Sequence, residues 1–288
     1  MTAGIPPVGR CIYCGATDPP LTREHVIPFG LGGNVVLPAA SCNECAKATS
    51  ALERDCLRGM FEIYRARTGY PTRRKKLARD LVHVAATFED GSTGFLDVPI
   101  TDYPQMLLLP TFPTARALCG LGHDRGVAID LGTWGWSDSE QIESFKSKYG
   151  LSGFTAVEVD PMKFSRFLAR IAFAGAIVRL GPDAFTSIGI DNILGLDPSM
   201  NFYVGSGDLV DMAWPEAKLP THQFKHFFHP DTGVVMMALR LFAHLDPPTY
   251  HVIVGHQAGG GIAKIMEQLP PFRKETQHPF PFQVHVNK

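Results

Sequence analysis

The 288-residue sequence predicts an α+β fold, and three patterns support that prediction. Two Cys-x-x-Cys pairs lie within the first 45 residues, a stretch too short to build a core of its own. A helix pattern with one apolar face begins at Pro161, and residues after Pro220 alternate with the period of two that strands show. The length suits two modest domains or one larger one. We expect an N-terminal unit over residues 1–70 and an α+β domain over residues 71–288.

Composition narrows the class of protein. Hydrophobic residues make up 45% of the chain, which suits a globular protein with a sizeable core. The first ten residues lack the apolar region of a signal peptide, and no run approaches the ~20 apolar residues that a membrane span needs. Paired cysteines without a leader are typical of a reducing compartment. We therefore expect a cytoplasmic protein with no membrane role.

Four of the six cysteines form the most specific motif in the chain. Cys11 and Cys14 make one Cys-x-x-Cys pair, and Cys42 and Cys45 make the second. Each pair can direct two sulfur atoms at one ion, and four thiolates close a tetrahedral zinc site with Zn–S distances of about 2.3 Å. The alternative is two chance pairs in a reduced chain. The arrangement favours a structural zinc ion.

A second motif lies between the cysteine pairs. Glu24 and His25 precede a Val-Ile-Pro step, and Gly32 and Gly33 follow before the second pair. Together with the cysteines, this segment resembles the zinc-binding form of the HNH endonuclease family over about residues 10–55. The resemblance implies a two-stranded ribbon followed by a helix, that is, an HNH-like ββα module. It also implies that His25 is the general base and that Glu24 holds a catalytic Mg²⁺ or Mn²⁺ ion.

General chemistry agrees with these two roles. An imidazole titrates near pH ~6.5 and can accept a proton at neutral pH, and a carboxylate is a hard oxygen ligand suited to Mg²⁺. Such an ion stabilises the charge that develops on phosphate during cleavage. The alternative is a buried structural His25 beside a surface Glu24.

The segment departs from the family pattern at two positions. Leu37 stands where the family usually has an Asn that orients the His, and Asn34 is a candidate substitute. Ala46 stands where the family has a metal-ligating His or Asn after the last cysteine, and Asn43 is the nearby candidate. The sequence therefore supports a catalytic ion less strongly than it supports the structural zinc.

Charge is unevenly distributed along the chain. The net charge is −1, but residues 1–80 hold 12 Lys and Arg against 7 Asp and Glu. Four consecutive cations, Arg73, Arg74, Lys75 and Lys76, form the densest basic strip. Such a strip beside a nuclease site can engage phosphates, and the alternative is a solvated helix face with a polar linker. We expect DNA as the partner, with RNA as a second option; a protein partner and the oligomeric state stay open.

Residues that end helices and strands, together with the spacing of apolar residues, predict the remaining helices and strands. A capping box over Ser50–Glu53 predicts a helix that ends near Gly69. Asp160 and Pro161 predict the start of a helix that ends at Gly181, with its arginines solvated or salt-bridged. The predicted strands are a hairpin over 82–98 that turns at Asp90-Gly91, a buried strand over 106–112, and an antiparallel meander over 222–228, 234–242 and 250–254, with a further strand over 283–286.

The leading function from sequence is a metal-dependent endonuclease that cleaves phosphodiester bonds in DNA. In this interpretation the C-terminal domain selects the target or partner. The alternative is a non-catalytic zinc module of a regulatory, sensing or adaptor protein. Leu37 and Ala46 are the residues that favour this alternative.

Overall fold

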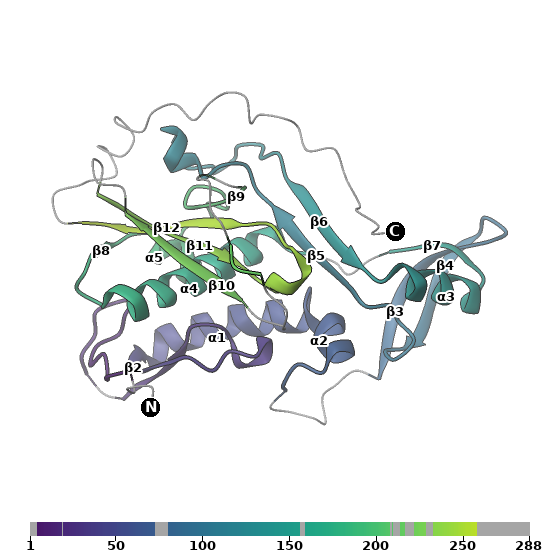
Figure 1. Ribbon diagram of the computed structural model, residues 1–288, viewed down its shortest axis with the longest axis horizontal. Helices are drawn as coiled ribbons and strands as arrows, with labels where there is room; N and C mark the ends of the chain where they lie inside the picture. Colours follow the sequence, from purple (N-terminus) through teal and green to yellow (C-terminus); the bar gives the residue numbers. More distant parts are fainter. Residues whose placement is uncertain are drawn as a thin grey trace.

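A computed structural model describes residues 5–18, 20–72, 80–155, 159–207, 209, 214–216, 222–228 and 233–257. Within them the protein is α+β, with several separate antiparallel sheets. Figure 1 shows the largest sheet above helix α4 (Pro161–Leu180), and both helix α1 (Asn43–Arg58) and the N-terminal hairpin lie on the other side of α4.

The N-terminal hairpin consists of β1 (Leu21–His25) and β2 (Val36–Cys42), which pair antiparallel. A 3₁₀ turn, η1 (Phe29–Leu31), lies between them, and α1 follows β2 directly. The segment before β1 is fastened to β2 by main-chain bonds, with 2.9 Å from Val8 N to Pro38 O and 2.8 Å from Ile12 N to Ala40 O. This pairing brings the first cysteine pair to the end of β2, where the second pair begins.

The helix expected from the Ser50–Glu53 capping box is wrong in its start and in its continuity, although a helix does end at the predicted Gly69. These residues lie inside α1, which begins at Asn43 with Cys42 as its N-cap and ends at Gly59. A second helix, α2 (Glu62–Thr68), follows and ends at Gly69. The chain breaks there because Gly59 favours helix poorly, and the break places Phe61 in the core, where its ring contacts three other phenylalanines.

The largest sheet contains β10 (Gln223–Phe228), β11 (Val234–Arg240) and β12 (Tyr250–His256), joined in that order. Its short edge partners are β8 (Thr186–Ser187) and β9 (Val204–Ser206), both paired with β12. The predicted meander is confirmed over these three long strands. The expected strand over 283–286 lies outside the described residues.

Helix α4 packs against β11 and β12 on one side and against α1 on the other. Its predicted bounds are confirmed, because Asp160 caps it by accepting the Lys163 N–H at 3.0 Å and Gly181 ends it. Thirteen of its residues are buried, so this helix is the centre of the molecule.

Two smaller sheets complete the fold. The predicted hairpin is confirmed as β3 (Leu81–Phe88) and β4 (Thr93–Pro99), and β7 (Leu151–Phe154) extends it on the β3 side. The predicted buried strand is β5 (Met106–Thr111), paired with β6 (Gly132–Ser137). The remaining elements are η3 (Arg116–Cys119), α3 (Ser139–Tyr149), α5 (Ile190–Leu194) and η4 (Ala243–Leu245).

One apolar core unites the N-terminal hairpin with the later chain. It contains Cys11 and Leu37 from the first 70 residues, Phe164 and Phe173 from α4, and Val252 from β12. This core includes residues on both sides of position 70, where two units were expected, and that division stays a prediction. No helix among the described residues combines the length and the apolar character that crossing a bilayer requires.

Candidate functional site

The four predicted zinc ligands are brought together. Their sulfur atoms, from Cys11, Cys14, Cys42 and Cys45, all lie within 4.8 Å of one another, and Cys14 Sγ is 3.7 Å from Cys42 Sγ. A tetrahedron with Zn–S bonds of about 2.3 Å has S···S edges of about 3.8 Å. The donor set and the spacing therefore fit a zinc ion with four thiolate ligands.

Local structure explains why the sulfurs converge. The first pair lies in a tight turn, in which Gly15 N donates to Cys11 O at 2.9 Å and Gly15 adopts a φ of +76°. The second pair begins α1, with Cys42 as the N-cap and Cys45 in the first turn. The main-chain N–H of Cys45 lowers the pKa of Cys42 to about 7, so this thiol is readily ionised for metal binding.

Glu24 takes part in a buried ion pair. The residue is 4% exposed, and Oε1 accepts the Tyr13 hydroxyl at 3.0 Å and Arg170 Nε at 2.9 Å. Arg170 Nη2 also pairs with the same oxygen and lies 2.7 Å from Glu53 on α1. Arg170 Nη1 donates to Val26 O at 2.9 Å.

This arrangement places a fixed protein cation at the carboxylate that the resemblance assigned to a metal ion. Burial alone would lower the pKa of Arg170, but Glu24 and Glu53 outweigh it and raise that pKa. Arg170 is 1% exposed, so its predicted salt-bridged state is confirmed, although in the core and not at the surface.

The other predicted site residues come from the N-terminal hairpin and from the start of α1. His25 ends β1 opposite Val36 and is partly exposed, and Leu37 is opposite Glu24 in the strand register. Asn34 is exposed in the loop after η1 and lines a cavity of about 460 Å³. Asn43 is exposed at the start of α1, so Asn34 and Asn43 stay predictions as substitute ligands.

The basic strip predicted to contact DNA, Arg73 to Lys76, lies outside the described residues.

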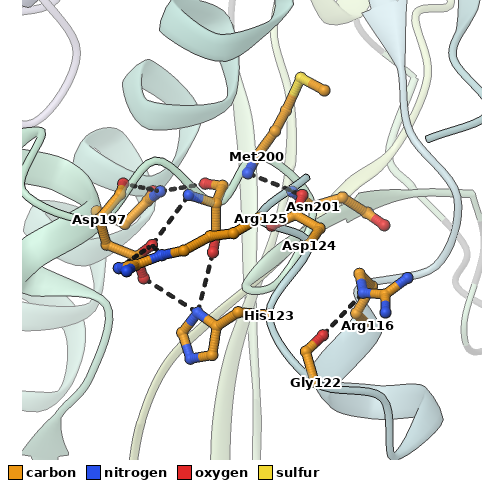
Figure 2. Close-up of polar contacts among 10 residues, drawn as sticks. Arg116, Gly122, His123, Asp124, Arg125, Asp197, Met200 and Asn201 are labelled. Atoms are coloured by element: carbon orange, nitrogen blue, oxygen red, sulfur yellow. Dashed lines mark hydrogen bonds and ion pairs between the residues drawn. The ribbon is translucent and has the colours of Figure 1, made fainter. Parts of the chain in front are cut away.

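Sequence reasoning missed a second polar cluster, drawn in Figure 2. His123, Asp124 and Arg125 from one loop meet Asp197 and its neighbours from another. No motif marks these residues, because the two loops lie more than 70 positions apart and only the fold joins them. The one available signal was the succession of His, Asp and Arg between glycines at 122 and 126.

Comparisons with protein-family models, with curated proteins and with solved structures found no match. The HNH resemblance therefore depends on the residues of this chain alone.

Proposed function

We propose that the N-terminal unit is an HNH-like zinc module that binds nucleic acid without cleaving it, on a protein of regulatory or adaptor type. The observation that carries this proposal is the buried pair between Glu24 and Arg170. A carboxylate that already accepts three donors on one oxygen, at 4% exposure, has little capacity for a hydrated Mg²⁺ or Mn²⁺ ion.

The first turn of helix α1 supports the same proposal. Ala46 lies in the first turn of α1, beside the zinc ligand Cys45, and offers no atom that can bind a metal. A catalytic ion would thus lose both of the ligands that the family resemblance assigns to it. The zinc ion would serve to hold the hairpin and α1 together.

Cleavage by a metal-dependent HNH endonuclease is the second candidate. The order of hairpin and helix, with Glu24-His25 closing β1 between the cysteine pairs, favours it. In that case His25 would take the proton from water, and Glu24 would have to exchange Arg170 for the ion.

A cleavage assay separates the two candidates. The wild type and the Ala46→His and His25→Ala variants are incubated with single- and double-stranded DNA and with RNA, in Mg²⁺ or Mn²⁺. We expect no cleavage by the wild type and none by Ala46→His, because Arg170 still holds Glu24. Cleavage by the wild type that His25→Ala removes by the ~10²–10⁴-fold typical of a lost general base would establish the endonuclease instead.

A binding assay tests the nucleic-acid role. Replacing Arg73 and Arg74 with Ala should weaken DNA binding and reduce its salt slope by about 0.9 for each lost phosphate contact with duplex DNA. The matched control removes two cations elsewhere, Lys146→Ala with Lys148→Ala on α3, and should leave the slope unchanged. Equal effects of both pairs would mean that the strip has no specific contact with DNA.

A further inference from the structure

A loop that follows η3 is held in place by a buried carboxylate. Asp124 is 5% exposed, and its Oδ2 accepts the main-chain N–H groups of Met200 at 2.9 Å and Asn201 at 2.7 Å. Figure 2 shows Asp124 pointing toward these groups from the middle of its loop. The residues on either side of Asp124 are exposed, so the anchored loop presents His123 and Arg125 at the surface.

The imidazole of His123 is held in position by contacts of its inner nitrogen and of its ring face. Its Nδ1 lies 3.2 Å from Asp197 Oδ2 and 2.9 Å from Ser199 Oγ, and its ring stacks on Phe202 at 3.9 Å between centroids. Burial raises the pKa of Asp197, but hydrogen bonds from Ser199 and Arg125 outweigh it and lower that pKa. Because an ionised carboxylate only accepts, we assign the proton to Nδ1, which leaves Nε2 as the outer nitrogen.

That outer nitrogen is available to a ligand. The His123 side chain is 43% exposed, and the residues that the structure describes provide no partner for Nε2. An imidazole oriented through its inner nitrogen by a buried carboxylate is the arrangement that proteins use to prepare the outer nitrogen for binding or proton transfer.

Arg125 is held beside the imidazole by the same carboxylate. Its Nη2 and Nε lie 3.1 Å and 3.3 Å from Asp197 Oδ1, while 58% of its side chain stays exposed. Asp197 itself is 7% exposed, so it faces His123 and Arg125 and not the solvent. Across the loop, Arg116 Nε donates to Gly122 O at 2.8 Å and adds another guanidinium to this surface.

We propose that His123 and Arg125 form a binding site for a phosphate group. A guanidinium offers paired N–H donors that match two oxygens of a phosphate, and an imidazole can form a hydrogen bond through its outer nitrogen with a further oxygen or P–OH group of the same phosphate. A metal ion is a poorer occupant, because within the described residues the four cysteines are the only group of three or more ligands close enough to share one. The site does not depend on the proposed role of the zinc module.

Nuclear magnetic resonance of the histidine rings provides the test on the full chain. Inorganic phosphate is titrated while the imidazole signals are followed, with the His123 signal identified by its loss in His123→Gln. We expect saturable shifts at His123, and an affinity about ten- to a hundredfold weaker in Arg125→Gln, as for a lost charge-assisted hydrogen bond. Both side chains are largely exposed, so these variants should fold.

Control variants and ligands decide the interpretation. Arg54→Gln removes one exposed cation from α1 and should leave phosphate affinity unchanged, so an equal loss there would overturn a specific site. A nucleoside 5′-monophosphate should shift the His123 signal and the nucleoside without phosphate should not, because the site is expected to bind the phosphate group. The same shift from the nucleoside, or no shift with phosphate at tens of millimolar, would refute the proposal.

Discussion

Replacing Arg170 with Met should destabilise the protein strongly, because it removes the partner of a buried carboxylate. Arg170 donates to Glu24, to Glu53 and to Val26 O from a position that is 1% exposed. Of the donors to Glu24 among the described residues, the variant would keep the Tyr13 hydroxyl. Met has a similar length and fills most of the space, so the packing changes less than the charge balance does.

The magnitude follows from the burial of the pair. Removing one partner of a buried ion pair costs about 3–5 kcal/mol, because the other charge stays in the core without compensation. Glu53 is 22% exposed on its side chain and reaches water, so it adds little to this loss. We therefore expect the free energy of unfolding, measured with urea and linear extrapolation, to fall by about 3–5 kcal/mol.

Two further variants make the reasoning refutable. Arg166→Met, one turn earlier on α4, removes hydrogen bonds to Asn192 O at 3.0 Å and to Ile193 O at 3.2 Å. Both acceptors are main-chain carbonyls and not buried carboxylates, so we expect the free energy of unfolding to fall by about 1–2 kcal/mol. Glu24→Gln combined with Arg170→Met should recover at least half of the loss. If Arg170→Met destabilised the protein no more than Arg166→Met does, or if the double variant were no more stable than Arg170→Met alone, the pair would not be a buried unit.

Two other predictions concern the metal and pH. The purified protein should contain about one zinc ion by elemental analysis. Cys42→Ser should lose this ion and unfold the hairpin region, because structural zinc contributes on the order of 10–16 kcal/mol to small domains. A wild-type protein stripped of zinc that has the same melting temperature as the zinc-bound protein would contradict this prediction. Burial lowers the pKa of His251 to about 3, below the value of about 6.5 in an unfolded chain. Because the unfolded state then binds the extra proton, His251 should make stability fall by up to about 1.4 kcal/mol per pH unit as the pH drops from 6.5 toward 4. His251→Gln, which keeps an acceptor for the Ala115 N–H, should flatten this acid limb, and an unchanged pH profile would exclude the contribution.

Features with a local cause were predictable from sequence. The cysteine cluster follows from two short spacings, and α4 follows from a capping Asp before Pro161 and a breaker at Gly181. The α1 boundary was missed because the Ser50–Glu53 pattern has the chemistry of a helix start, while the helix begins earlier, with Cys42 as its N-cap. A capping motif inside a longer helix carries no signal that distinguishes it from a true start.

Features that depend on distant pairing were not predictable. Glu24 and Arg170 are separated by 146 positions, and His123 and Ser199 by 76. An arginine in an apolar helix pattern predicts either a solvated or a paired side chain, and only the packing of α4 on the hairpin decides which. Periodicity gives the face of an element, but it does not give the partner across the core.

The buried pair also connects the zinc cluster with the centre of the molecule. Tyr13 lies between the candidate zinc ligands Cys11 and Cys14 and donates to Glu24, which in turn pairs with Arg170 of α4. The ring of Tyr13 packs on Phe173 of the same helix, at 5.8 Å between centroids. Loss of zinc would release the turn that holds Tyr13, and so remove a donor and an aromatic contact from α4. The metal should therefore stabilise the shared core as well as the first 45 residues, and its removal should lower the cooperativity of unfolding across both.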